Sequence, residues 1–397
     1  MQAHKSATQR KYNSSNEDGY IKIISLFILH NAPAETEDAQ AFAVGVQKKI
    51  LYFFICMFGN LYFNVMKKYT NITLLLLLVP VVCLNAQVKL NGYTDYHVHL
   101  QDSATIELGY QMLKAMQTEP EKMDSVFLDA DTIIERLNKA GFEYAWILSN
   151  AYLFGSPLVT VENEYEEVKK QNDWIAAQAA RYPKRLKAFI SVNPLKPYAL
   201  DEIARCAANK RFTGLKLHFA NSEINLFDTA QVAQLQKVFA AANKYHLLML
   251  VHFRSGQDWD GFANTKVLLE QLMPYAKDTK VVIAHMAGWG GYDESSDKAL
   301  KLIAAYLHED NAYSKNLYVE LSAVFPLTLN EDYEPPKNKD DWNAIEELKK
   351  RVSEIGTDHV LFGTDFPLID IGPYIQLLND ALGMDIVQQV LNNKSIH

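Results

Sequence analysis

Residues that can bind metal ions stand at the ends of several short apolar segments of this 397-residue chain. The first segment ends in His97-Val98-His99, and because alternate side chains of a strand share a face, these two imidazoles can converge on one point. Later segments end in residues of the same kind: Lys216 with His218, His252, His285 and Asp365.

The number of these residues matters more than any one of them. A lone histidine at a strand end is more often solvated or hydrogen-bonded than a metal ligand. Burying five imidazoles and a carboxylate together, however, costs free energy unless a cation compensates for it. Mixed nitrogen and oxygen ligands suit Zn²⁺, with Mn²⁺ and Fe²⁺ as alternatives. The residues therefore predict a divalent metal site.

Eight short segments rich in β-branched or aromatic residues supply these ends. Between them lie amphipathic stretches with apolar residues three and four positions apart, at 131–140, 163–181, 228–245, 263–276, 296–308 and 341–355. The predicted strands are Tyr93–Leu100, Tyr144–Asn150, Leu186–Val192, Gly214–His218, Leu247–Phe253, Lys280–Met286, Leu317–Ala323 and Val360–Asp365.

Strict alternation of strands and helices predicts an α/β fold with a parallel sheet. Eight units over about 300 residues match a (β/α)₈ barrel of the TIM type. An open doubly wound sheet is the alternative, because periodicity does not reveal whether the sheet closes. In a barrel the carboxyl ends of the strands meet at the mouth, so the polar residues above would lie together.

The first 86 residues differ in charge from the rest. They have a net charge of +3, whereas residues 87–397 carry 31 basic and 42 acidic side chains, a net of −11. Residues 66–86 begin with methionine and two lysines, continue with an apolar run and end in alanine, which is the order of a cleavable secretory signal. We therefore expect an exported protein, periplasmic or secreted. An uncut anchor or a structural helix are the alternatives.

The domain organisation follows from this signal. Residues 1–65 show no domain pattern, and we interpret them as a spurious or disordered extension ahead of a start at Met66, with a membrane hairpin as the alternative. Residues 87–397 are predicted to form a single domain without a stable membrane span. Their acidic balance argues against nucleic acid as the main partner. We expect a small-molecule substrate.

Five segments resemble the amidohydrolase superfamily, specifically its amidohydrolase-related branch: TDYHVHL, GLKLHF, LVHF, VVIAHMAGWGG and VLFGTDFP. The resemblance spans residues 92–392 and implies a distorted (β/α)₈ barrel with a catalytic metal. The family includes hydrolases of amides, lactones and esters, as well as non-oxidative decarboxylases and hydratases. The resemblance implies metal ligation by His97, His99, His252 and Asp365, and a role for His285 on the substrate or the metal-bound water.

The expected mechanism follows from these roles. A divalent metal can lower the pKa of a bound water to about 7, and Asp365 can accept that proton and pass it to the leaving group. His285 can hydrogen-bond the water or polarise the attacked carbonyl. We expect His218 and Arg254 to contact the substrate, with Arg254 either a carboxylate clamp or a solvated loop residue.

Lys216 is the main ambiguity. In some relatives a lysine on the fourth strand is carbamylated and bridges two metals. Lys216 precedes His218 by two residues and lies about one layer deeper, so we expect one metal ion and keep a binuclear site as the alternative. Glu320 and Ser322 share a face of the seventh strand and are expected to support the ligands or the substrate. Trp289 either walls the pocket or packs within a loop.

Hydrolysis of an amide, lactone or ester is the first interpretation, because a secretory signal favours an enzyme that begins by cutting. A metal-dependent decarboxylase or hydratase is the second, because both chemistries use the same ligands. A non-catalytic metal- or ligand-binding protein would need a missing catalytic position, and neither His285 nor Asp365 is missing. Because relatives often dimerise, a homodimer is a possible assembly.

Overall fold

The computed structural model describes residues 90–119, 125–256, 258–289, 291–309, 311–325 and 339–396. The predictions for residues 1–65 and for the signal at 66–86 lie outside these residues. All of the described residues belong to one compact unit. Within them, every helix is too short or too polar to cross a membrane.

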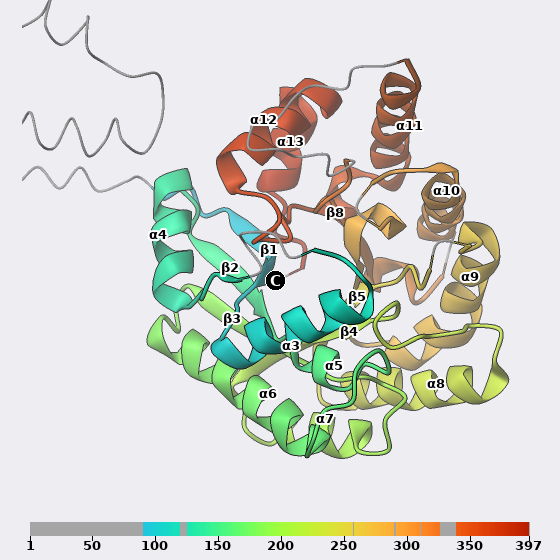
Figure 1. Ribbon diagram of the computed structural model, residues 1–397. Coiled ribbons are helices and arrows are strands. Elements are labelled where there is room, and N and C mark those ends of the chain that lie inside the picture. The colour runs from blue at the N-terminus through green and yellow to red at the C-terminus, as the bar shows by residue number, and fades with distance from the viewer. Residues whose placement is uncertain are drawn as a thin grey trace, which may run out of the picture. The chain divides into compact units, whose positions relative to one another are not determined.

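Eight parallel strands pair in sequence order around a nearly closed barrel (Figure 1). This arrangement confirms the predicted (β/α)₈ fold over the open sheet. The strands are β1 (Thr94–His99), β2 (Tyr144–Leu148), β3 (Leu186–Ser191), β4 (Phe212–His218), β5 (Leu248–His252), β6 (Val281–Ile283), β7 (Leu317–Glu320) and β8 (Val360–Leu361).

The barrel closes where β1 meets the segment that follows β8. The Tyr96 amide donates to the Phe362 carbonyl at 3.0 Å, and a parallel bridge pairs Val98 with Phe366. The prediction of a six-residue eighth strand was therefore wrong. Asp365 has a left-handed backbone with φ of 59°, which interrupts the extended chain while its amide still donates to the His97 carbonyl.

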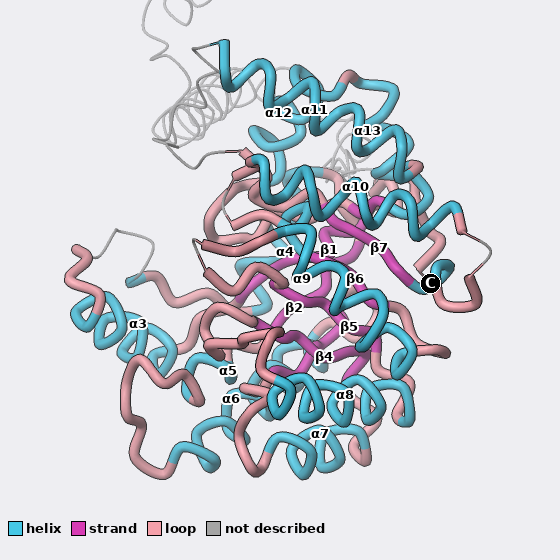
Figure 2. Tube along the Cα trace, turned by 90° about the vertical axis from the view of Figure 1, so that its right-hand side faces the viewer, coloured by secondary structure: helices cyan, strands magenta, loops and turns pink. Residues whose placement is uncertain are grey.

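Helices surround the strands on the outside of the barrel (Figure 2). Each of the six predicted amphipathic stretches contains a helix, although 263–276 continues beyond its α-helix as a π turn and a 3-10 turn. The sequence analysis gave no ranges for α3, α5, α7, α12 and α13. The helices are α3 (Ser103–Ala115), α4 (Ala130–Ala140), α5 (Ala151–Phe154), α6 (Glu164–Arg181), α7 (Ala199–Ala207), α8 (Thr229–Lys244), α9 (Gly261–Val267), α10 (Glu294–His308), α11 (Lys339–Ile355), α12 (Ile371–Leu382) and α13 (Met384–Leu391).

Alternate strand residues build two cores. Leu215 and Leu217 of β4 point outward into the layer between strands and helices, as expected from the two-residue period of a strand. The barrel interior is filled by large rings: Trp146 stacks on Phe189 at 4.5 Å between ring centres and meets Tyr96 edge-on at 4.8 Å. The polar strand-end residues lie above this packed layer, so the barrel is closed beneath them.

Candidate metal centre

The carboxyl ends of the strands surround a cavity of about 680 Å³. Eight of the nine predicted site residues lie along its wall, and Arg254 does not. The lining residues are His97, His99, Gln101, Thr105, Gly109, Met112, Leu113, Met116, Asn150, Tyr152, Leu153, Lys216, His218, Asn221, His252, His285, Trp289, Ala323, Asp365, Pro367 and Leu368.

The floor of this cavity brings ligand-type atoms close together. His97, His285 and Asp365 each offer one such atom, and the three atoms lie within 4.8 Å of one another. His97 Nε2 lies 3.1 Å from Asp365 Oδ1, and His285 Nε2 lies 3.9 Å from Asp365 Oδ2. His99 Nε2 lies 3.2 Å from His97 Nε2 and 3.5 Å from Asp365 Oδ1, so the two β1 histidines converge as predicted.

Glu320 orients the first of these imidazoles. Its carboxylate is fully buried at the end of β7, and Oε1 accepts from His97 Nδ1 at 2.8 Å. A carboxylate oxygen can only accept a hydrogen bond, so the proton of the neutral His97 ring lies on Nδ1. His97 therefore presents the lone pair of Nε2 to the cavity. Fixing a histidine ligand through its other ring nitrogen in this way is common at metal sites.

Ser322 orients His285 by the same logic. The Ser322 hydroxyl donates to Glu320 Oε1 at 2.6 Å, so its oxygen accepts from His285 Nδ1 at 2.8 Å. The Ser322 carbonyl oxygen lies 3.1 Å from the same nitrogen, and a carbonyl can only accept. In the neutral ring of His285 the nitrogen without a proton is therefore Nε2, as it is in His97. Glu320 and Ser322 were expected to support the site, and this geometry shows how they orient two of its rings.

Burial keeps the two β1 imidazoles, His97 and His99, neutral. It lowers the pKa of His97 well below its usual value, with the Lys216 charge acting in the same direction. Burial also lowers the pKa of His99 to about 4, although the nearby Asp365 opposes the shift. For Asp365 itself, burial raises the pKa, but His97, His285 and His99 outweigh it and hold the pKa below its usual value. The floor therefore joins two neutral β1 imidazoles to an ionised carboxylate.

The donor chemistry of this floor fits a divalent cation. His97 Nε2, His285 Nε2 and the Asp365 carboxylate all offer lone pairs to the same space, and the Lys216 ammonium contacts His97 Nε2 from the side at 3.0 Å. A cation between the three groups would be attracted by each of them. His252 adds a fourth nitrogen to the wall. Its Nε2 is buried and makes no hydrogen bond to any part of the chain that the structure describes. Imidazole nitrogen with carboxylate oxygen is a common ligand set for zinc and manganese.

His218 and His252 stack face to face, with ring centres 3.9 Å apart. The His218 Nδ1 atom accepts from the Asn221 amide at 3.2 Å, so in the neutral ring the proton lies on Nε2. Burial lowers the pKa of His218 well below its usual value, which keeps the ring neutral. His218 can therefore donate a hydrogen bond into the cavity, as a substrate contact requires.

Lys216 is 1% exposed and its ammonium lies 3.0 Å from His97 Nε2. Burial lowers the pKa of Lys216 to about 8, against the attraction of Asp365 and Glu320. It is the one Lys or Arg side chain among the described residues that line the cavity. Its ammonium group therefore lies beside the ligand-type atoms, where the sequence analysis considered a bridging role.

The structure does not place Arg254 among the residues that line the cavity. Its guanidinium donates to Asp293 at 2.6 Å and to the Gly256 carbonyl at 3.2 Å. Asp293 also caps the first turn of α10, where it accepts from the Ser296 amide. The predicted carboxylate clamp is therefore engaged by a neighbouring loop, because a partner 39 residues away cannot be read from local pattern. Trp289, by contrast, does wall the cavity and is 44% exposed.

A buried ion network behind the floor was missed by the sequence analysis. Arg136 of α4 donates to Asp95 of β1 at 3.0 Å, to the Thr364 hydroxyl at 3.0 Å and to Asp370 at 2.8 Å. Asp95 accepts in turn from the Thr364 amide at 3.0 Å. This network ties β1 to the residue that precedes Asp365. The sequence offered one signal of this network, because Arg136 occupies a buried position of the amphipathic helix α4.

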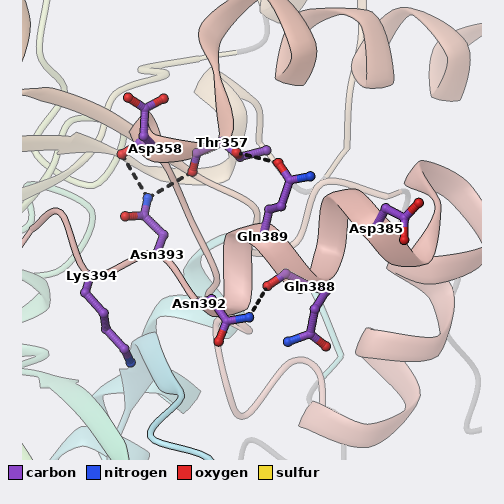
Figure 3. Close-up of a pocket in the computed structure, with 8 residues that line it drawn as sticks. All are labelled: Thr357, Asp358, Asp385, Gln388, Gln389, Asn392, Asn393 and Lys394. Atoms are coloured by element: carbon purple, nitrogen blue, oxygen red, sulfur yellow. Dashed lines mark hydrogen bonds between the residues drawn. The ribbon is translucent and has the colours of Figure 1, made fainter.

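A second hollow, of about 720 Å³, lies at the opposite end of the barrel and is drawn in Figure 3. Asn393 donates there to the carbonyls of Thr357 and Asp358, at 3.0 and 2.9 Å. The lining residues are Thr357, Asp358, Asp385, Gln388, Gln389, Asn392, Asn393 and Lys394, with no histidine among them. Its side-chain amides fasten the end of the chain to the start of β8, which is a structural role.

The family model of the amidohydrolases matches residues 94–388. The chain belongs to this family, whose members are metal-dependent enzymes. Among curated proteins, the gamma-resorcylate decarboxylase of Polaromonas sp. strain JS666 is 24% identical over 228 residues, which cover 52% of this chain and 67% of that protein.

Solved structures of low sequence identity share the fold. A 5-carboxyvanillate decarboxylase from Sphingomonas paucimobilis has a TM-score of 0.53 at 16% identity, covering 76% of this chain and 96% of that one. A dihydroxybenzoic acid decarboxylase from Polaromonas sp. JS666, solved with bound manganese and the inhibitor 2-nitroresorcinol, has a TM-score of 0.52 at 17% identity, covering 76% and 95%. These likenesses support the barrel architecture.

Proposed function

We propose that the protein is a metal-dependent decarboxylase of a small carboxylic acid. The observation that carries a metal-dependent reaction is the convergence of His97 Nε2, His285 Nε2 and the Asp365 carboxylate, whose ligand-type atoms face the same part of the cavity. The likeness to gamma-resorcylate decarboxylase favours decarboxylation over hydrolysis, which the sequence analysis had placed first. Hydrolysis of a small carbonyl compound is the competing outcome of the same experiment.

The proposed ligands are the residues implied by the sequence resemblance: His97, His99, His252 and Asp365. A bound divalent cation would act as the Lewis acid that holds substrate oxygens and withdraws negative charge. Manganese and zinc both suit these ligands, and the proposal is for one ion per chain. Lys216 donates to His97 in the structure and would be the residue to bridge a second ion.

The chain's own residues must handle one proton. Decarboxylation breaks the bond between the carboxylate carbon and its neighbour, releases CO₂ and leaves the electron pair on the neighbouring carbon, which then takes up a proton. Asp365 and His285 lie 3.9 Å apart on the floor and can hold that proton between them. His218 can donate from Nε2 to a substrate oxygen. Ser322 keeps His285 in the required tautomer.

The test combines metal analysis with a split assay. Chelator-treated protein is reloaded with Mn²⁺ or Zn²⁺, the bound metal is measured by mass spectrometry, and each form is given hydroxybenzoic acids, lactones and amides. Release of CO₂ supports the proposal. Acid release from lactones or amides without CO₂ would refute decarboxylation and show that the protein is a hydrolase. A content of about two metal ions per chain would refute the mononuclear centre.

The matched variants are Asp365→Asn and Asp385→Asn. Asp365→Asn should abolish turnover while it retains much of the metal, because the amide can still offer an oxygen but cannot carry the proton. Asp385 lies in the polar hollow at the other end of the barrel, so its variant should keep full activity. Wild-type turnover by Asp365→Asn would remove this residue from proton transfer.

A further inference from the structure

Helix α3 forms one wall of the cavity. It lies between β1 and α4, as an addition to the regular alternation of strand and helix. In Figure 2 it lies on the side of the barrel opposite the C-terminus. Asp102 caps it by accepting from the Thr105 amide at 2.8 Å, and Gln171 of α6 donates to Asp102 at 2.9 Å. Leu108 packs into a small apolar cluster with Phe154, so the helix is fixed in place.

Beyond Thr105 in its first turn, the face of α3 toward the cavity is apolar and contains a glycine. Gly109, Met112, Leu113 and Met116 all line the cavity, at the three- and four-residue spacing of one helix face. We call these four residues the α3 wall. Glycine within a helix costs about 0.5–1 kcal/mol relative to alanine. An added Cβ at Gly109 would meet no atom within 4 Å. Packing against the protein therefore does not require glycine here, and the space in front of it belongs to the cavity.

The charge of the cavity is confined to its floor. Lys216 and Asp365 are the charged side chains among the described residues that line it, and both lie with the histidines. Arg254, the nearest predicted clamp, is bonded to Asp293. Leu153 and Leu368 continue the apolar lining beyond the α3 wall. A charged substituent next to this wall would thus lose its hydration without gaining an ion pair.

We propose that the α3 wall determines substrate specificity by receiving an uncharged, apolar substituent, with Gly109 leaving the space for it. The substrate class is then an amphipathic acid whose polar, reacting end lies at the histidine floor and whose other end is a hydrocarbon group. The inference rests on the proposed function, since the floor must hold the reacting end. It goes further by stating what the rest of the molecule must be.

The test uses straight-chain hydroxamic acids of two, four, six and eight carbons, because hydroxamates chelate divalent metals whatever their tail. Their binding to manganese-loaded protein is measured by calorimetry, which requires no turnover. The affinity of the wild type should rise with chain length, by up to about fourfold for each methylene group that the wall buries. Acetohydroxamate, which has almost no tail, reports on the metal centre alone.

The decisive comparison is between Gly109→Leu and the wild type. Leucine at Gly109 fills the space in front of the wall, so it should weaken the eight-carbon probe at least tenfold and leave acetohydroxamate unchanged. Gly109→Ala should show a smaller loss in the same direction, at a melting temperature no lower than that of the wild type. Gly372→Ala is the control, because an added Cβ there also meets no atom within 4 Å and the residue lies outside the cavity.

Two results would overturn the inference in distinguishable ways. Equal affinities for all chain lengths, or an unchanged affinity of Gly109→Leu for the eight-carbon probe, would refute the role of the α3 wall in specificity. Neither result would contradict the metal centre. Failure of every probe to bind the wild type, acetohydroxamate included, would refute the metal centre and with it this inference.

Discussion

Glu320 allows a sharp test of how the proposed centre is held. Its two oxygens accept from four groups: His97 Nδ1 at 2.8 Å, the His285 amide at 3.1 Å, the Ser322 hydroxyl at 2.6 Å and the Ser322 amide at 2.5 Å. Every partner is a donor and the carboxylate is fully buried. The group thus fixes two strand ends and the tautomer of one proposed ligand at once.

The change Glu320→Gln keeps the shape of the side chain but replaces one acceptor by an NH₂ donor. In either orientation of the amide, that donor faces another donor: the Ser322 amide on one side, His97 and the His285 amide on the other. A hydrogen bond to a charged group contributes about 1.5–3 kcal/mol, and a buried unpaired donor adds a similar penalty. Loss of such a supporting carboxylate typically weakens metal binding about 10- to 100-fold, which corresponds to about 1.4–2.8 kcal/mol.

The assay is a competition titration of Mn²⁺ or Zn²⁺ against a chromogenic chelator, together with a melting curve of the metal-free protein. Glu202→Gln is the control, because Glu202 is also fully buried and bonded to Arg205 and Asn172, but belongs to the outer layer between α6 and α7. It should lower stability and leave metal affinity intact. Wild-type affinity in folded Glu320→Gln would refute the argument that this carboxylate orients a ligand.

Three more predictions concern the same barrel. Gly363→Ala should destabilise the protein by about 1–3 kcal/mol and lower metal affinity in the same titration. The reason is that its added Cβ would lie 2.7 Å from Glu320 Oε2 and 2.9 Å from His97 Cβ. An unchanged melting curve would show that the strands move apart more easily than we expect. Burial opposes ionisation of Asp297, but bonds from Lys301, Tyr292 and Arg351 lower its pKa to about 2. A carboxyl group whose pKa is lower in the folded than in the unfolded protein stabilises the fold at pH values above its unfolded pKa. Asp297→Asn should therefore lower the free energy of unfolding by about 2 kcal/mol at neutral pH. That difference should shrink as the pH of the urea titrations falls from about 4 to about 2, and a constant difference would contradict the assignment. Chelation of the metal should lower the melting temperature, since it leaves acceptors facing one another, and added Mn²⁺ should restore it; equal melting temperatures would argue against a cation at this position.

Much of the fold could be predicted because its signals are local. Strands such as β6 show a short run of β-branched residues, and helices such as α8 show their period within a dozen residues. Alternation then places every second residue of a strand on one face. The convergence of His97 and His99 followed from that period alone. Helix α3 escaped prediction because it faces apolar surroundings on two sides, the core at Leu108 and the cavity at Gly109, which blurs the amphipathic pattern.

The features that could not be predicted depend on contacts distant in sequence. His285 and Asp365 adopt left-handed backbones with φ of 58° and 59°, and neither is a glycine that would signal this. The surrounding structure holds both conformations, and such strain is common at functional sites. Arg254 was expected in the cavity and is held by Asp293 instead. A local pattern gives the type of a residue and its face, but not the partner that arrives from another loop.

The closure of the barrel has a consequence for how the protein is made. His97 lies on the first strand, while Asp365 follows the last one, and the two segments meet through the Asp365 amide and the His97 carbonyl. A chain still emerging from the ribosome holds its amino-terminal histidines long before the aspartate exists. The floor can therefore be assembled only after synthesis has passed Asp365, so metal would be acquired late, by a nearly finished chain.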